Sequence, residues 1–275
     1  MSPQDEWERF VRMAGLPDAE IDLAGAGFLI AAMEYPELDL DHQFGQLDSL
    51  AEAVAGRLDT SRDPLFCVNT LSEYLFDELG FQGNLDDYYD PRNSFLNEVL
   101  QRRLGIPITL SLVCIEVGKR LDIPLLGVSM PGHFLLRHQG EEDLYIDPFN
   151  KGILLSEEEC AQRLQQVTQA NVPWDPRFLA PVSNRDFVAR ILRNLKNIYL
   201  ERQDHDHAIM TIDRLIVLQP DVTLERRDRG IVRYNLGRHE ESLEDLTIYL
   251  DSDPEGGNVA DVERLVRRLR DLLGD

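Results

Sequence analysis

The sequence predicts a mostly helical α+β protein in which a small antiparallel sheet lies between two helical regions. Three observations predict this class. Apolar residues recur with a helical period up to residue 121. Between residues 125 and 147 they form short runs separated by turn residues, as strands do. From residue 185 onward the helical period returns and repeats itself at an interval near 34 residues.

Amphipathic spacing predicts the helices of the first region. They are expected at residues 18–33, 47–58, 64–80, 94–105 and 108–121. Pro64 suits the first turn of a helix, and Gly80 and Gly105 suit helix ends, because glycine adopts the left-handed backbone conformation at little cost. A turn-rich stretch, GNLDDYYDPRN, precedes the fourth helix.

Three strands are expected after Pro124. They are LLGVSM (125–130), HFLLRH (133–138) and DLYID (143–147). The tetrapeptide SEEE at 156–159 then matches a capping box, which predicts a helix that reaches about residue 168.

A proline-rich stretch marks the expected boundary between two domains. NVPWDPRFLAPVSN, residues 171–184, contains three prolines and is expected to be a linker. The sequence thus predicts a first domain over residues 1–170 and a helical domain over residues 185–275.

The second domain contains an internal repeat. IYLERQDHDHA, which ends at Ala208, aligns with RYNLGRHEESL, which ends at Leu243, at an offset of 35 residues. This offset pairs Tyr199 with Tyr234, and a proline follows each unit at a spacing of 34 residues. The pattern resembles tetratricopeptide repeats. Two units and a final helix are too few for a free-standing array, so we expect them to stack on the preceding domain.

The overall charge restricts the possible partners. Lys and Arg number 28 against 50 Asp and Glu, which gives a formal net charge of −22. Such a surface repels phosphate backbones and anionic bilayers, so no nucleic acid and no membrane is expected as a partner. The charge either keeps the protein soluble or forms a docking face for a basic protein. The oligomeric state is not predicted.

The remaining composition indicates a cytoplasmic protein. Cys67, Cys114 and Cys160 are widely spaced, which fits neither a disulfide framework nor a zinc motif. The N-terminal MSPQDEWERF is acidic where a signal peptide would be basic, and the longest apolar run, residues 24–33, is too short to span a bilayer. Phosphate-loop, G-x-S-x-G and H-E-x-x-H motifs are absent from the sequence, so no cofactor and no metal is predicted.

A histidine and an aspartate are expected to meet across the second hairpin. A three-residue loop, Gln139-Gly140-Glu141, would pair His138 with Glu142. That register places His133 opposite Asp147, Leu135 opposite Tyr145 and Arg137 opposite Asp143, and it leaves the even-numbered apolar residues on the core face. A carboxylate on an imidazole prepares a base that can activate Ser or Cys, but it can also simply tie two strands together.

Several motifs around this hairpin resemble the bacterial SirB family of transglutaminase-like proteins. They are RNS (92–94), GIPITLSL (105–112), PGHFLLR (131–137) and IDPFNKG (146–152). The resemblance runs from about residue 25 to the C-terminus and includes the repeat tail. It implies a transglutaminase-like, papain-like core.

The resemblance also assigns roles to individual residues. In the transglutaminase-like superfamily a Cys at the start of a helix is activated by a His on one strand and an Asp on the next. His133 matches this His and Asp147 matches this Asp. The corresponding helix begins near Pro107, and this proline or a close neighbour occupies the position of the missing nucleophile.

Three other residues on the same helix are candidate replacement nucleophiles. Cys114 lies about two turns into the helix and is most simply a small buried residue. Thr109 and Ser111 are nearer the expected place, but a hydroxyl is a weak nucleophile without a well-placed base. Thr109 is expected to serve the helix terminus instead.

Asn93 and Ser94 in the RNS motif have two interpretations. Either residue could cap the helix that is expected to begin near Phe95. Alternatively, one of them lies at the edge of the cleft that contains His133, where an amide or a hydroxyl can bind a carbonyl group or an anion.

These patterns support two main hypotheses of function. The first is a regulatory, non-catalytic protein that binds protein partners through its repeat tail or its acidic surface. The second is an acyl transferase or hydrolase in which His133 is the base and Asp147 orients it, with Thr109, Ser111, Cys114 or water as the nucleophile. A third hypothesis is a small-ligand sensor that uses the vestigial cleft.

Overall fold

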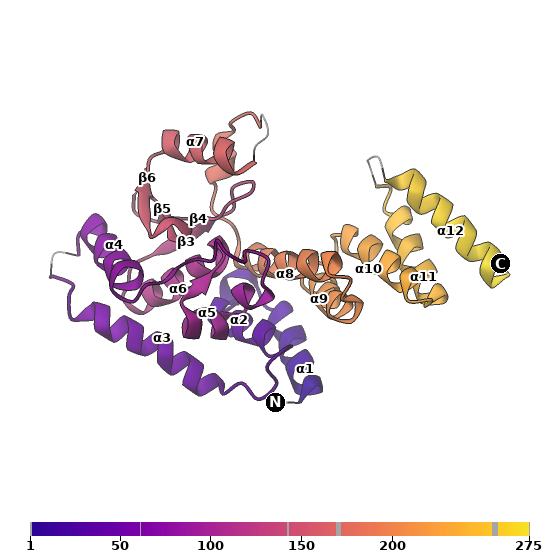
Figure 1. Cartoon of the computed structure of the whole chain (residues 1–275), viewed down its shortest axis with the longest axis horizontal. Helices are drawn as coiled ribbons and strands as arrows, with labels where there is room; N and C mark the ends of the chain where they lie inside the picture. The colour runs from indigo at the N-terminus through magenta and orange to yellow at the C-terminus, as the bar shows by residue number, and fades with distance from the viewer. Residues whose placement is uncertain (1, 61, 142, 169–171, 255–257, 275) are drawn as a thin grey trace. The chain divides into compact units, whose positions relative to one another are not determined.

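The computed structural model describes residues 2–60, 62–141, 143–168, 172–254 and 258–274. The chain forms two compact units, Met1–Ile191 and Leu192–Asp275. The structure confirms the predicted class, because a helical region, a small sheet and a second helical region follow one another along the chain (Figure 1).

Helices form most of the first unit. Those that come before the antiparallel sheet in the sequence are α1 (Pro3–Ala14), α2 (Leu23–Ala31), α3 (Leu40–Ala55), α4 (Pro64–Ser72), α5 (Leu96–Arg102) and α6 (Pro107–Arg120). Asp22, Asp39 and Asp63 each accept a backbone N–H in the first turn of the helix that follows, as N-cap residues do. Helix α6 is buried from Pro107 to Gly118 and packs against α2, α3 and α5.

Several helix bounds differ from the expectation: α1 was not predicted, the helix expected at 18–33 spans Leu23–Ala31, and the one expected at 47–58 spans Leu40–Ala55. Helix α4 continues as a π-helix, Glu73–Glu78, before Gly80 ends the segment with a φ of 76° as predicted. Helix α5 ends at Arg103, whose φ is 59°, and not at Gly105. Gly105 belongs to β2 (Leu104–Gly105), which pairs in parallel with β1 (Gln82–Gly83). The helical pattern before Gly105 therefore extends past the true end of the helix.

The three predicted strands are confirmed, and a fourth joins them. Strands β3 (Leu125–Val128), β4 (Leu135–His138), β5 (Tyr145–Asp147) and β6 (Ile153–Leu155) form an antiparallel sheet in this order.

The predicted register between β4 and β5 is wrong by two residues. Leu136 pairs with Ile146 and Arg137 with Tyr145, whereas the sequence predicts Leu135 opposite Tyr145. The His138 N–H donates to the Leu144 carbonyl (3.3 Å), so the turn is longer than three residues. Glu142, the expected partner of His138, lies outside the described residues. A shift of two residues keeps every side chain on its face, which is why the pattern does not reveal it.

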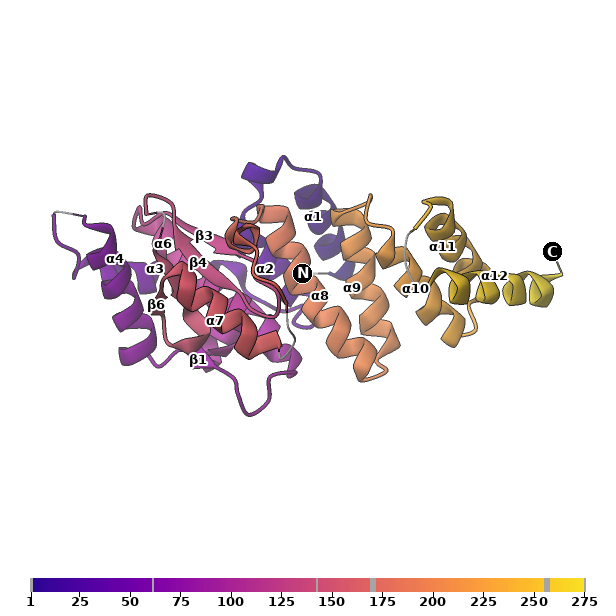
Figure 2. The same ribbon diagram turned by 90° about the horizontal axis from the view of Figure 1, so that it is seen from above.

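Both faces of this sheet are covered. Helix α6 packs against one face, on β3 and β4. Helix α7 (Glu157–Thr168) covers the other face, where Leu135 and Tyr145 form a cluster with Cys160 and Leu164 (Figures 1 and 2). The predicted capping box of α7 is confirmed, because the Glu159 N–H donates to Ser156 Oγ (3.3 Å) and the Ser156 N–H donates to Glu159 Oε2 (2.8 Å).

The segment expected as a linker is packed against the first unit. Trp174 and Phe178 lie against the cluster beneath α7, and Leu179 is part of it. The Val182 N–H donates to the Gly127 carbonyl at 2.9 Å, next to a bridge between Val128 and Pro181. The prolines thus shape a covering segment, and the boundary between the compact units falls after Ile191. Residues 169–171 lie outside the described part of the chain.

The second unit is built from helices. They are the C-terminal part of α8 (Asn184–Glu201), then α9 (His205–Leu218), α10 (Leu224–Asn235), α11 (His239–Asp251) and α12 (Val259–Leu273). Helix α9 packs against α10, and α10 packs against α11, so that each helix contacts the next one in the sequence, as in tetratricopeptide repeats.

The offset between the two repeats is 34 residues and not 35. Gln203 and Gly237, at φ values of 57° and 73°, occupy the same turn position. Ala208 and Ser242 are both fully buried near the start of the second helix, whereas Leu243 is only partly buried. The tyrosines are therefore not equivalent, and Ser242 is the small residue that the repeat requires.

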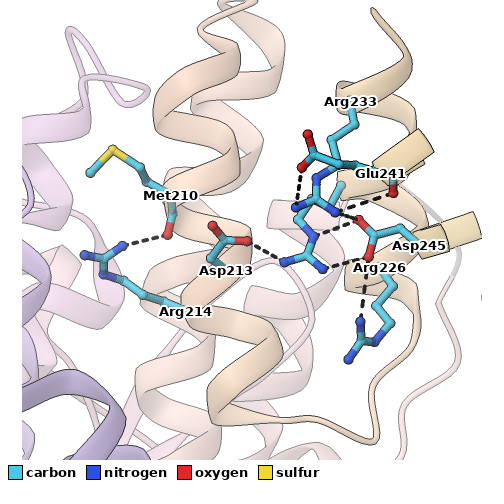
Figure 3. A network of polar contacts seen from close by, with 8 residues as sticks. Met210, Asp213, Arg214, Arg226, Arg233, Glu241 and Asp245 are labelled. Atoms are coloured by element: carbon cyan, nitrogen blue, oxygen red, sulfur yellow. Dashed lines mark hydrogen bonds and ion pairs between the residues drawn. The ribbon is translucent and has the colours of Figure 1, made fainter. Parts of the chain in front are cut away.

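A buried carboxylate joins the helices of the second repeat (Figure 3). Asp245 on α11 is 1% exposed and accepts hydrogen bonds from Arg229 (2.7 and 2.8 Å) and Arg233 (2.7 Å) on α10. Arg226 lies 3.7 Å away, and Arg229 also donates to Asp213 of α9 (2.5 Å). Because three helices share this network, its charges fix their relative orientation.

Candidate functional site

The hairpin brings His133 and Asp147 together as the sequence predicted. Nε2 of His133, just before β4, lies 2.9 Å from Oδ1 of Asp147 at the end of β5. The side chains are 4% and 0% exposed. The two atoms are in close polar contact, although their geometry is not that of a well-aligned hydrogen bond. The two residues meet although they are not directly opposite in the register.

Asp147 has further partners that the sequence did not reveal. Its carboxylate accepts hydrogen bonds from the backbone N–H of Asn150 (3.2 Å) and from Asn150 Nδ2 (2.7 Å), and Arg163 Nε lies 3.5 Å away. Burial by itself raises the pKa of Asp147, but His133, Asn150 and Arg163 together outweigh it and lower the pKa below its ordinary value. Asp147 is therefore ionised at neutral pH and holds the imidazole in place.

Aromatic side chains cover the pair. The Phe149 ring lies edge-on to the His133 ring, with ring centroids 6.1 Å apart. The Tyr88 ring packs edge-on against the Phe149 ring, with centroids 5.9 Å apart. A Cβ atom at Gly83 would lie 2.4 Å from the Phe149 ring, so this glycine makes room for the ring. Arg190 donates to the backbone carbonyl of His133 (2.9 Å) and fixes the loop before β4.

The hydroxyl groups near the start of α6 are already engaged. Pro107 is the first residue of the helix and supplies no reactive group. Thr109 Oγ1 donates to the Asn93 carbonyl (2.6 Å) and accepts the N–H of Ile106 (3.1 Å). Ser111 Oγ donates to the Pro107 carbonyl (2.8 Å). Thr109 and Ser111 are fully buried, and their bonds stabilise the helix start, which is the role that the sequence predicts for Thr109.

The three thiols are buried, and burial raises the pKa of each. Cys114 lies inside α6, where burial raises the pKa of its thiol. The pKa of Cys67 is raised for the same reason. Burial raises the pKa of Cys160 to about 12, and the charge of Asp147 also contributes. A thiolate is the reactive form of cysteine, so these environments disfavour thiol chemistry.

Asn93 and Ser94 do not cap a helix, so that interpretation is wrong. Helix α5 begins after Phe95 without a side-chain cap, and the RNS motif forms a 3₁₀ helix, Pro91–Ser94. Asn93 is fully buried and donates from Nδ2 to the carbonyls of Asp87 (2.7 Å) and Tyr88 (3.2 Å). It therefore holds the loop that places Tyr88 on Phe149. Ser94 is buried, and its hydroxyl has no hydrogen-bond partner among the described residues.

Phe149 and Asn150 could have been found from the sequence, because both lie inside the IDPFNKG motif. Arg163 and Tyr88 could not, since they come from a later helix and an earlier loop. Within the described ranges no group of three or more His, Cys, Asp or Glu side chains is placed to hold a metal ion. Nor does the described part of the chain contain a helix that is long and apolar enough to cross a membrane.

The fold and this site define the class of the protein. Residues 42–193 match the model of the transglutaminase-like superfamily, and residues 195–270 match a tetratricopeptide-repeat model. A protein of Xylella fastidiosa named UPF0162 is 39% identical over 251 residues, which are 90% of this chain and 89% of that protein. The chain therefore belongs to the UPF0162 family within the transglutaminase-like superfamily.

More distant relatives share smaller parts of the chain. The UPF0162 protein of Vibrio cholerae is 30% identical over 221 residues, or 80% of this chain and 82% of that protein. F-box only protein 21 of Homo sapiens is 33% identical over 167 residues, or 56% of this chain and 26% of that protein. No solved structure matches the chain.

Proposed function

We propose that this protein is a regulatory interaction protein of the cytoplasm, and that its transglutaminase-like domain positions partners without catalysing acyl transfer. The observation that carries this proposal is the state of the nucleophile position. Thr109 and Ser111 are bonded to backbone carbonyls, and Cys114 is buried with a raised thiol pKa. An oriented base without a nucleophile cannot perform nucleophilic catalysis.

The covered His–Asp pair fits a structural role. His133 and Asp147 connect two strands, and Asn150 and Phe149 complete a closed cluster around them. A buried charged group that keeps all its partners contributes to a single, well-defined arrangement of the hairpin. The motifs shared with the SirB family are consistent with this proposal, and membership in that family is part of it.

The second unit offers a surface for a partner. A groove of about 660 Å³ lies between α11 and α12, with Leu243, Ile248 and Leu273 as its apolar side chains and Glu240 and Glu244 as its acidic ones. An apolar groove with acidic edges fits a basic, amphipathic segment of another protein. A homologous segment that takes in more than half of this chain forms about a quarter of F-box only protein 21, and such use within a longer chain fits an interaction module.

The alternative, an acyl transferase or hydrolase, is favoured by one observation. Asp147 is ionised and lies 2.9 Å from the imidazole, an arrangement that also prepares a general base. Such an enzyme would need a water molecule, or one of the candidate side chains moved next to His133, as its nucleophile.

A cross-linking experiment in cells separates these functions. A photo-reactive residue at Thr247, in the groove, should capture a specific partner with a basic segment, and Glu244→Arg should abolish the capture. Glu201→Arg, at an exposed position on α8 with the same change of charge, should not. His133→Gln should leave the capture intact. The proposal would be contradicted if Glu244→Arg did not reduce the capture. It would also be contradicted if the protein showed a hydrolytic turnover that His133→Gln abolishes.

A further inference from the structure

A second groove, in the first unit, carries an inference that goes beyond partner binding. It has a volume of about 510 Å³, within the range of small-molecule sites. One wall is the part of α3 from His42 to Leu50. The other wall is formed by the π-helix, Phe81 and the end of α5. It is lined by residues outside the His133 site and was not predicted from the sequence.

Three costly backbone features converge on this groove. Gly45 lies in the interior of α3, where glycine destabilises a helix relative to alanine. A Cβ atom added at Gly45 would have no other atom within 4 Å. The opposite wall contains a π-helix, a form that occurs often at functional sites. Arg103 has a φ of 59°, which is unfavourable for a residue with a side chain. Packing does not require Gly45, so its effect is to keep the groove open.

The side chains that line the groove match one chemical class of ligand. Leu50 and Leu79 are the half-buried apolar side chains of the lining, Phe81 and Leu100 are buried, and Arg103 is exposed at the same wall as Leu79. The Arg103 guanidinium donates to the Leu79 carbonyl (2.6 Å), which fixes it at this wall. None of the described residues that line the groove is a carboxylate, although the chain has 50 Asp and Glu.

Two neighbouring groups increase the preference for an anion. Gln46 Nε2 donates to His42 Nε2 (3.1 Å), so in the neutral ring Nδ1 carries the proton and remains a donor. Arg57 lies over the Tyr74 ring at 4.5 Å and pairs with Glu78 (2.9 Å), which neutralises one of the three acidic residues of the π-helix; the other two, Glu73 and Asp77, are exposed and do not line the groove. From these observations we infer that the groove binds a small amphipathic carboxylate, with its apolar body against Leu50 and Leu79 and its carboxylate on Arg103.

Equilibrium dialysis of the full chain against three carboxylates tests this inference. The probes are 2-naphthoate, indole-3-acetate and decanoate, and 2-naphthamide is the neutral match of the first. At least one carboxylate should saturate a single site and should bind more tightly than the amide. Arg103→Gln should weaken carboxylate binding about tenfold or more and should remove the preference over the amide, because a charge-assisted contact is lost.

A pair of glycine variants tests the location without depending on charge. Gly45→Leu fills the groove and improves helix propensity, so it should keep or raise the melting temperature while it abolishes binding. Gly56→Leu, at the end of the same helix and also with nothing within 4 Å, should bind as the wild type does. The inference is overturned if no carboxylate saturates the wild type at millimolar concentration, if Gly45→Leu still binds, or if the amide binds as tightly.

Discussion

Replacing Asp147 with alanine removes the acceptor on which the candidate site is built. Asn150 loses two hydrogen bonds, at 3.2 and 2.7 Å, and His133 and Arg163 lose their carboxylate partner. Each hydrogen bond to a charged group contributes about 1.5–3 kcal/mol, and breaking a buried ion pair from one side costs about 3–5 kcal/mol. We therefore expect the free energy of unfolding of the first unit to fall by about 4 kcal/mol.

Tryptophan fluorescence can measure this loss in the first unit alone. The two tryptophans of the chain, Trp7 and Trp174, both lie in that unit. With a urea dependence of about 2–3 kcal/mol per molar, the midpoint should fall by roughly 1.5–2 M. Asp143→Ala, at an exposed position in the same hairpin, should change the free energy of unfolding by less than about 0.5 kcal/mol. An Asp147→Ala shift as small as that of the control would refute the reasoning.

The same site predicts a pH dependence. The pKa of Asp147 is lowered from its ordinary value of 3.8, so ionised Asp147 stabilises the fold fully above that value. As the pH falls through the lower pKa of the folded state, this stabilisation is lost. The difference in stability between the wild type and Asp147→Asn should thus stay constant from neutral pH to about pH 4.5 and close only below it. A difference that closes between about pH 6 and 5 would contradict the assignment.

Three further predictions concern the surroundings of the site and the repeat unit. Asp245→Ala should destabilise the second unit by about 3–5 kcal/mol in thermal unfolding followed by circular dichroism, whereas Glu241→Ala, at the exposed end of the network, should cost less than about 1 kcal/mol. Thr109→Val should cost about 1–3 kcal/mol in urea unfolding and Thr109→Ser much less, because only serine keeps the hydroxyl that bonds to backbone groups at the start of α6. Gly83→Ala should displace the Phe149 ring, and a changed ring-current shift of the His133 protons in the NMR spectrum would report it; unchanged shifts would contradict the contact between these two rings.

The sequence predicted the His–Asp pair but not its register, and the reason is physical. Side chains alternate in a strand with a period of two, so a slip of two residues leaves every apolar residue on its face. Gly140 favours a three-residue loop, whereas the pairing of Arg137 with Tyr145 requires a longer one. The pair survives because the long side chain of His133 reaches Asp147 across the end of the hairpin.

The covering elements could not be predicted because their signals lie far apart in the sequence. Helix α7 and the proline-rich segment after it have the patterns of a surface helix and a linker, yet Cys160, Leu164 and Leu179 complete the core under them. In the repeats, the tyrosines suggest an offset of 35, while the small buried residues that set helix packing, Ala208 and Ser242, give 34. Close packing at small residues is visible only in three dimensions.

The central claim is that no nucleophile serves the His133–Asp147 pair. Labelling with a mechanism-based thiol probe at neutral pH, under native conditions and quantified for each cysteine by mass spectrometry, tests it most directly. We predict that Cys67, Cys114 and Cys160 all react slowly and at rates that His133→Ala does not change, as their raised pKa values require. Rapid labelling confined to Cys114 and abolished by His133→Ala would contradict the claim and identify a relocated catalytic thiol.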